Sequence, residues 1–424
     1  MQEFSSYGII IACSLLIIVS YLFNRLASKT NIPAVLLLIA LGIIIKQIDG
    51  EEGFFATINL LPLLELLGIA GLIMIVLEAA LDLKLSRDKM KIIWRSFFLA
   101  LIGLIVNAAL IAWVIKVMWE LDWFVSVLYA IPLSIMSSAI IIPSVINLVD
   151  RKREFMIYES TFSDIFGIIA FYFLLEMGNV DHTAGQMAWS LSGNILLTIV
   201  ISFLSSFLLI YLFQQIKSGT KFFLMLAVLF LLYSIGKELH LSSLLVVLVF
   251  GIILSNHELF RKGILKKIID KDNVQSLLGD FNTVTQESSF VVRTFFFFVF
   301  GLSISLSSLF HGRVVLVSLI ILVIIYMIRF FTTKFLFKSN HYPEWQIAPR
   351  GLITILLFYG IPTQYHIEGF QEFQGILLFI ILVTSIVMAY GLIHSGKKRN
   401  KIMDIIEPMD EIMPETSSDD MLSE

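Results

Sequence analysis

Long apolar runs separated by short polar segments recur along the whole chain. A helix needs roughly 20 mostly apolar residues to cross the hydrocarbon core of a bilayer, and about thirteen runs approach this length. They lie near residues 8–24, 33–48, 61–82, 94–115, 124–149, 155–177, 188–213, 222–236, 239–255, 289–309, 314–333, 347–362 and 374–394. The pattern predicts an all-α integral membrane protein of the cell membrane with about thirteen transmembrane helices, although the eighth and ninth runs could form one broken helix.

Composition supports this fold class. The 424 residues are 58% apolar and only 15% charged, whereas soluble domains are about 45–50% apolar and about 25% charged. These values argue against a soluble enzyme, a nucleic-acid-binding protein and a disordered scaffold. The single Cys13 excludes a disulfide framework and a cysteine-based metal site. Without a nucleotide-binding fingerprint, the sequence indicates no cofactor and no nucleic-acid partner.

The positions of the basic residues predict the orientation of the chain. With the amino terminus placed outside, most of the 30 Lys and Arg residues fall in alternate connecting segments on the inside. This bias predicts an odd number of spans, with the amino terminus outside and the carboxyl terminus inside. The segment 256–288 is expected to be a Lys-rich loop along the bilayer surface. Residues 1–395 are expected to form the membrane domain, and residues 396–424 a short, acidic, disordered cytoplasmic tail.

Ionisable residues inside predicted spans are candidates for function, because burying a charge in a bilayer is costly. The deep ones are Glu78, Glu159, Asp164, Arg293, Arg329 and Arg350. Asp164 lies about 14 Å into its span, close to mid-membrane. Ser160 precedes Asp164 by four residues and shares its helical face, and Glu159 and Ser163 form a second such pair. Arg329 lies at a comparable depth, where it could neutralise either Glu159 or Asp164.

Two predicted spans carry helix-breaking residues in corresponding places. The fifth contains Ser137, Ser138 and Pro143, and the twelfth begins with Arg350-Gly351. Proline removes a backbone donor and frees carbonyl groups for other partners. Broken segments at equivalent positions of two inverted repeats, here spans 1–6 and 8–13, are typical of a transport site at the midplane. The alternative is an ordinary proline kink, satisfied by Ser137 and Ser138.

These residues resemble those of the monovalent cation:proton antiporters, in particular the NhaP-type sodium/proton exchangers, and the resemblance covers roughly residues 8–395. Family members carry a sixth-helix motif of Glu, then Ser or Gly, and later Asn-Asp. Glu159, Ser160 and Ser163-Asp164 occupy its places. Other matches are Glu78 in the third helix, Arg329 in the eleventh and Arg350-Gly351 in the twelfth. Two departures are Ile141-Ile142-Pro143, where many relatives have Thr-Asp-Pro, and Ser163, where they have Asn.

The resemblance implies an inverted-repeat antiporter fold without enzymatic activity. Its expected parts are a dimer-forming scaffold within 8–82 and 222–309, a linker span at 188–213 and ion-translocating spans within 94–177 and 314–394. Asp164 would bind Na⁺, or Li⁺ or K⁺, in competition with a proton, assisted by Ser160, Ser163, Glu78 and the broken-helix residues. Glu159 and Arg329 would form a structural ion pair. Exchange would be electroneutral, with the homodimer surrounded by membrane lipid.

Three other functions fit an apolar chain of this kind. A cation channel would conduct passively and would not need a carboxylate that competes for protons. An integral-membrane enzyme would place several polar catalytic residues in an interfacial loop, but the loops are short and poor in polar residues. A transporter of organic anions would expose its arginines to the pathway, whereas Arg329 is expected to have a carboxylate partner.

Overall fold

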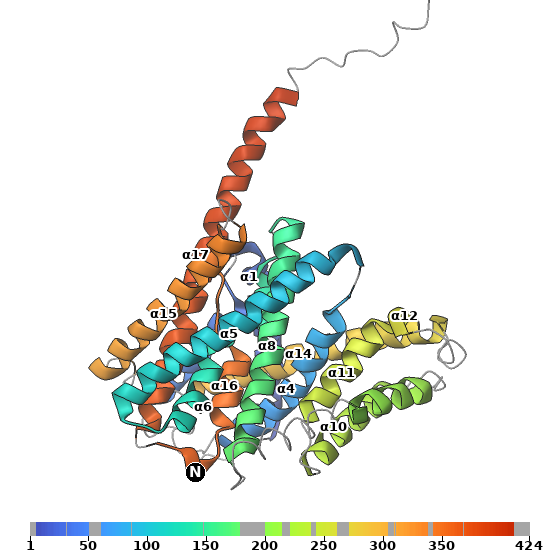
Figure 1. The fold of residues 1–424 in the computed structure, drawn as a ribbon, viewed down its shortest axis with the longest axis horizontal. Helices are drawn as coiled ribbons and strands as arrows, with labels where there is room; N and C mark the ends of the chain where they lie inside the picture. Colours follow the sequence, from blue (N-terminus) through green and yellow to red (C-terminus); the bar gives the residue numbers. More distant parts are fainter. Residues whose placement is uncertain are drawn as a thin grey trace, which may run out of the picture.

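The computed structural model describes residues 6–30, 32–50, 61–85, 87–146, 148–178, 200–213, 221–238, 243–260, 271–303, 309, 311–337, 342–367 and 369–410. The regular structure within these ranges is entirely helical (Figure 1), as predicted. Seven of the described helices are long and apolar enough to cross a membrane, and three shorter apolar helices accompany them. Of the predicted span 188–213, the described part is the helix Val200–Phe213, and the remainder lies outside the described residues.

One group of helices packs around α4 and α14. It consists of α1 (Ser6–Thr30), α2 (Ala34–Asp49), α4 (Leu61–Asp82), α10 (Lys221–Glu238), α11 (Ser243–Ser255), α12 (His257–Phe260) and α14 (Lys271–Ser303). Gly42 and Gly301 allow α2 and α14 to approach closely, because a Cβ on either residue would collide with a backbone carbonyl of the other helix. Ser20 and Thr294 join α1 to α14 by a buried hydrogen bond of 2.6 Å.

A second group contains the predicted polar sites. Its elements are η1 (Arg87–Lys89), α5 (Met90–Trp119), α6 (Trp123–Ser134), α7 (Ser138–Ser144), α8 (Asp150–Gly178), α15 (Gly312–Phe337), η3 (Glu344–Gln346), α16 (Leu352–Tyr359), η4 (Thr363–Tyr365) and α17 (Phe370–Asp410). Helix α5 packs against α6, α8 and α15, and α15 packs against α17. Helices α4 and α11 of the first group approach α8 and α16 around a shared cavity.

The fifth and twelfth predicted spans are both interrupted. The segment between α6 and α7 is extended, with φ −75° and ψ 133° at Ile135 and φ −76° and ψ 113° at Ser137. The break therefore precedes α7, whereas Pro143 lies inside that helix, so the expectation that Pro143 causes the break is wrong. In the twelfth span, α16 is only eight residues long and begins after Gly351.

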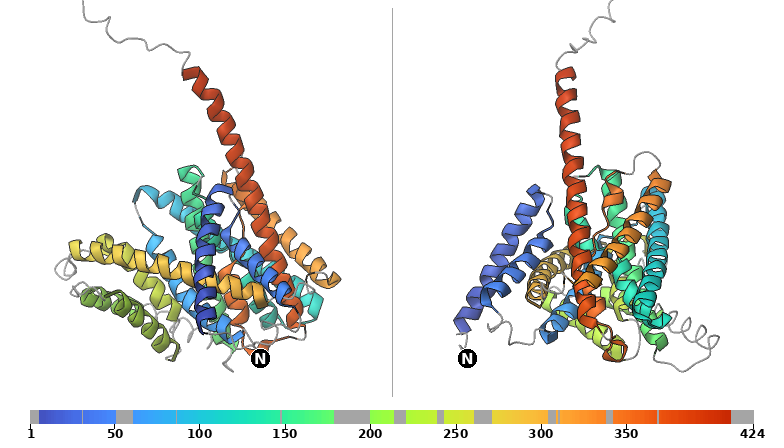
Figure 2. Two further views of the ribbon diagram at one scale, coloured as in Figure 1. Left: turned by 180° about the vertical axis from the view of Figure 1, so that it is seen from behind. Right: turned by 90° about the vertical axis from the view of Figure 1, so that its left-hand side faces the viewer.

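Two other boundaries differ from prediction. Helix α14 begins at Lys271, so much of the loop expected at 256–288 is helical. Its first turns bury Val274, Leu277, Leu278 and Phe281, the spacing of one apolar helical face. Helix α17 continues to Asp410 and projects from the bundle (Figure 2), so it includes the first part of the tail expected from residue 396. Propagating an existing helix costs little, and Lys, Arg and Met favour it. Residues 411–424 lie outside the described residues.

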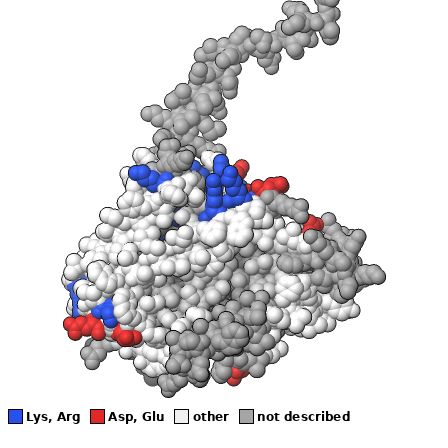
Figure 3. All heavy atoms as spheres, viewed as in Figure 1, with Lys and Arg blue, Asp and Glu red and all other residues white. Residues whose placement is uncertain are grey.

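Charged side chains gather toward the two ends of the molecule. In the view of Figure 3, Lys and Arg cluster near the base of the projecting helix, a mixed charged group lies at the opposite end, and the visible surface between them is largely uncharged. Exposed apolar side chains in the middle of α5 include Phe98, Ile102 and Ile105. A broad uncharged belt bounded by charge is the surface expected of a protein embedded in a bilayer.

Candidate functional site

The two interrupted spans cross each other at their extended segments. The backbone N–H of Ser137 donates to the Pro349 carbonyl at 2.9 Å. The crossing requires glycine at position 351, because a Cβ there would lie 2.5 Å from Ser137 Oγ and 2.8 Å from Ile140 Cδ1. The breaks therefore form one joint structure, in which each extended segment satisfies backbone groups of the other.

Arg350 binds the free carbonyl groups at the carboxyl-terminal end of α6. Its Nε donates to the Leu133 carbonyl at 2.8 Å and its Nη2 to the Ser134 carbonyl at 3.3 Å, while Nη1 reaches the Ala348 carbonyl at 2.8 Å. The last carbonyls of a helix lack intrahelical partners and carry partial negative charge. The buried guanidinium satisfies them, and its own backbone N–H donates to Thr384 Oγ1 at 3.1 Å.

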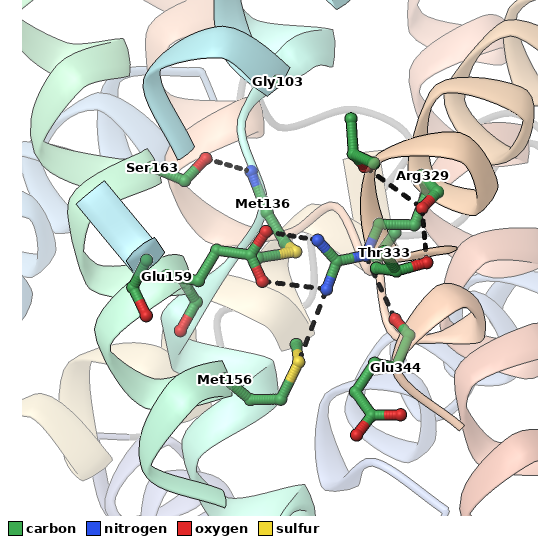
Figure 4. Close-up of polar contacts among 12 residues, drawn as sticks. Gly103, Met136, Met156, Glu159, Ser163, Arg329, Thr333 and Glu344 are labelled. Atoms are coloured by element: carbon green, nitrogen blue, oxygen red, sulfur yellow. Dashed lines mark hydrogen bonds and ion pairs between the residues drawn. The ribbon is translucent and has the colours of Figure 1, made fainter. Parts of the chain in front are cut away.

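Asp164 and Ser163 of α8 hold the other side of the break. The Ser138 backbone N–H donates to Asp164 Oδ2 at 3.1 Å, and the Met136 N–H donates to Ser163 Oγ at 2.9 Å (Figure 4 shows the second bond). Asp164 thus supplies negative charge at the first turn of α7, where helical N–H groups are unpaired. Its second oxygen, Oδ1, is buried and has no hydrogen-bond partner in the part of the chain that the structure describes.

A small cavity lies beside Asp164, between α8, α16 and the helices α4 and α11. Its lining residues are Ile75, Val76, Ala79, Asp164, Ile165, Ile168, Ile169, Leu244, Leu248 and Ile353. Asp164 is the only ionisable residue among them, and its side chain is almost fully buried, with 2% exposed. A carboxylate with one unshared oxygen in an apolar cavity has the oxygen chemistry that a hard cation or a proton requires.

Arg329 contacts Glu159, one of the two carboxylates of α8 that were predicted as its possible partners (Figure 4). The pair is bidentate: Nη1 donates to Glu159 Oε1 and Nη2 donates to Oε2 at 2.9 Å. Nη2 also contacts Met156 Sδ at 3.4 Å, and Nε donates to the Glu344 carbonyl at 3.1 Å. Both side chains are buried. Glu159 is therefore committed to an ion pair, whereas Asp164 has no cationic partner among the described residues.

Two residues expected at the cation site lie elsewhere. Glu78 does not line the cavity; its Oε1 is 3.5 Å from Arg293 Nη2 of α14. Position 78 is rotated by about 100° from the cavity-lining Ala79 around α4, which explains the difference. Ser160 Oγ donates to the Ile157 carbonyl of its own helix at 3.1 Å. The structure brings Asp164 together with Ser138, but neither Glu78 nor Ser160 makes a described contact with it.

A second, more polar cavity lies on the opposite side of α8. Glu159, Ser163, Arg329 and Arg350 line it together with Asn107 of α5. Asn107 Nδ2 donates to the Gly103 carbonyl at 2.7 Å, and its Oδ1 is buried without a hydrogen-bond partner within the described ranges. Asn107 was not among the predicted site residues, although an amide in the middle of an apolar run is a signal that could have revealed it.

The sequence analysis also missed a buried ion pair between the start of α8 and η3. Lys152 Nζ lies 2.7 Å from Oε1 of Glu344, whose side chain is fully buried. Glu344 precedes the predicted span 347–362, so nothing local in the sequence indicates that its carboxylate is enclosed.

Comparison with known families decides how this arrangement is classified. The profile of the family described as sodium/hydrogen exchanger, transmembrane, matches residues 13–394. The chain belongs to the sodium/hydrogen exchanger family. As a member of a transporter family, it is not an enzyme, and its location is an integral membrane one, as predicted. No protein with a curated description matches it.

The fold of this sodium/hydrogen exchanger family member has similar solved structures. It is similar to the sodium proton antiporter MjNhaP1 from Methanocaldococcus jannaschii at pH 8, with a TM-score of 0.66, 20% identity and coverage of 91% of this chain and 97% of that one. An electron-microscopy structure of the same antiporter gives a TM-score of 0.65, 20% identity and coverage of 93% and 97%. At this identity the likeness establishes the NhaP antiporter fold.

Proposed function

We propose that this protein exchanges a monovalent cation, Na⁺ in the first place, for H⁺ at Asp164. The observation that carries the proposal is the buried, unshared Oδ1 of Asp164 in a cavity whose other lining residues are apolar. Family membership supports the sodium/proton pair, and MjNhaP1, a sodium proton antiporter, has the same fold. Li⁺ and K⁺ share the preference for oxygen ligands and are the other candidate cations.

Competition at one carboxylate accounts for the coupling. When protonated, Asp164 is neutral, and when ionised, it binds a cation that has shed its water to enter a space of about one water molecule. An ionised, empty carboxylate is unfavourable in an apolar cavity, because burial penalises an unpaired charge. Only the two loaded forms therefore change conformation readily, and this restriction enforces exchange.

The charges around the site favour a one-to-one exchange. Glu159 and Arg329 neutralise each other, and Arg350 stays bound to the carbonyls of α6. The site thus carries the same net charge when Asp164 holds a proton as when it holds one monovalent cation. Exchange of one cation for one proton moves no net charge, so we propose an electroneutral stoichiometry.

We further propose that the group containing α5–α8 and α15–α17 moves against the group around α4 and α14. The Asp164 cavity lies between these groups, with α4 and α11 on one side and α8 and α16 on the other. The segments 8–82 and 222–309 would act as scaffold and homodimer interface, and the span at 188–213 as linker. Glu78, paired with Arg293, would contribute its charge from outside the immediate ligand set.

The test is cation-driven dissipation of a pH gradient in proteoliposomes, with the membrane potential clamped and unclamped. Asp164→Asn should abolish exchange driven by Na⁺, Li⁺ and K⁺. Asp122→Asn is the matched control, because Asp122 is another carboxylate that caps a helix, accepting from Phe124 N at 2.9 Å, outside the cavity. The control should exchange at the wild-type rate. Undiminished exchange by Asp164→Asn would refute the proposal.

The same vesicles test the remaining alternative of a cation channel. An electroneutral exchanger dissipates the pH gradient equally well with and without the potential clamp. A channel would instead give a cation current that follows the voltage and shows no coupling to protons.

A further inference from the structure

Within one turn of Asp164, the face of α8 that borders its cavity contains one more polar residue. Successive residues of an α-helix are about 100° apart. The four α8 residues that line the cavity are Asp164, Ile165, Ile168 and Ile169, and they occupy a sector of about 140° that begins at Asp164. Thr161 lies about 60° into this sector, one turn nearer the start of α8, although it does not itself line the cavity. Ser160 lies about 40° outside it, on the other side of Asp164.

The hydroxyl groups of Ser160 and Thr161 differ in their hydrogen bonds: the first has a backbone acceptor and the second has none among the described residues. Ser160 Oγ donates to the Ile157 carbonyl at 3.1 Å. That carbonyl is four residues before Thr161 and is the usual acceptor for a threonine hydroxyl in a helix. Thr294 and Thr384, for example, donate to the carbonyls four residues earlier at 2.8 and 2.7 Å. Thr161 Oγ1 has no hydrogen-bond partner among the described residues, although Thr161 is only 1% exposed.

Thr161 and Asp164 therefore present two unshared oxygens on one face of one helix. Side chains three residues apart on a helix have Cβ atoms about 5–6 Å apart, close enough for their oxygens to reach a common ion. A hydroxyl offers two lone pairs, and a hard alkali cation prefers such neutral and anionic oxygens. Leaving a buried hydroxyl unpaired is unfavourable, and a bound cation would satisfy it.

We propose that the Thr161 hydroxyl, and not that of Ser160, binds the transported cation together with Asp164 and sets the affinity for it. This inference rests on the proposed function, in which Asp164 carries the cation. It predicts that the hydroxyl at position 161 matters for the cation and much less for the proton, because protonated Asp164 needs no second oxygen ligand.

The experiment compares Thr161→Ala with Thr161→Ser. Both variants lose the methyl group, and they differ only in the hydroxyl. In proteoliposomes, Thr161→Ala should raise the KM for Na⁺ about tenfold relative to Thr161→Ser, with a similar maximal rate. Ser160→Ala should keep a KM close to the wild-type value. A second readout is Na⁺-dependent thermal stabilisation of the purified proteins, which reports binding by mass action without transport. It should need about tenfold more Na⁺ in Thr161→Ala.

Equal Na⁺ affinities for Thr161→Ala and Thr161→Ser, by either readout, would overturn the inference. A large loss of affinity in Ser160→Ala with none in Thr161→Ala would also overturn it, in favour of Ser160 as the ligand. Both results leave the proposed function intact as long as Asp164→Asn abolishes exchange. If Asp164→Asn keeps full exchange, the proposed function itself fails.

Discussion

Asp164 Oδ2 accepts a hydrogen bond of 3.1 Å from the backbone N–H of Ser138, so a carboxylate of α8 caps the first turn of α7. At the other side of the break, Arg350 binds the last carbonyls of α6. Each helix end thus meets a side chain of opposite charge. The residue proposed to exchange cation for proton is also part of what holds the broken helix together, which links the occupancy of the site to its local structure.

The crossing of the two extended segments depends on the absence of a side chain at Gly351. Gly351→Ala places a Cβ 2.5 Å from Ser137 Oγ and forces the segments apart. We expect a destabilisation of about 1–3 kcal/mol, typical of overpacking in a filled site, and a lower maximal exchange rate. Thermal unfolding in detergent and vesicle exchange measure the two effects. Gly103→Ala is the control, because a Cβ at Gly103 meets nothing within 4 Å. Equal stability of the two variants would show that the crossing tolerates a side chain.

The buried pair of Glu159 and Arg329 predicts a non-additive response to substitution. Glu159→Gln leaves the Arg329 guanidinium buried without its carboxylate, and removing one partner of a buried ion pair costs about 3–5 kcal/mol. Replacing both residues by uncharged ones removes the stranded charge. We therefore expect the double variant Glu159→Gln/Arg329→Gln to unfold at a higher temperature than Glu159→Gln alone. A double variant that is less stable by the sum of the two single effects would argue against this pairing.

The ion pairs of α8 with neighbouring segments should differ in strength. Glu344 is fully buried and lies 2.7 Å from Lys152 Nζ, whereas Glu154 is 26% exposed in its pair with Lys89. Glu344→Gln should lower the stability by about 3 kcal/mol or more, and Glu154→Gln by about 1 kcal/mol or less. High salt should weaken only the second pair, because solvent-exposed charges are screened. Thermal unfolding at two salt concentrations tests both statements.

The sequence was sufficient to predict the helical membrane fold from its apolar runs, and the interruption of the fifth and twelfth spans from the proline and glycine residues in them. It could not locate the break in the fifth span. Pro132 inside α6 and Pro143 inside α7 flank it, yet the extended residues 135–137 are held by groups distant in the chain, including Ser163, Asp164 and the Pro349 carbonyl. Tertiary hydrogen bonds, not a helix-breaking residue, determine where this helix opens.

For the candidate site, the sequence indicated most of the residues but not which of them contact one another. Depth in the span singled out Asp164, Glu159 and Arg329, but depth does not say which face of α8 meets α15, so the partner of Arg329 stayed open. Glu78 was expected beside Asp164 from the family resemblance, yet α4 turns it toward Arg293. The choice between Ser160 and Thr161 depends on which hydroxyl takes the Ile157 carbonyl, and spacing along the sequence does not contain that information.

In the proposed mechanism, proton and cation compete for Asp164. The most direct measurement is the apparent KM for Na⁺ in proteoliposomes over a series of pH values, at fixed membrane potential. Competition at one carboxylate makes a specific prediction. Below the pH at which Asp164 is half protonated, the KM for Na⁺ should rise about tenfold for each unit of pH decrease, while saturating Na⁺ restores the same maximal rate. A KM that does not change with pH while the maximal rate falls would contradict the account, because it would place the titrating group outside the cation site.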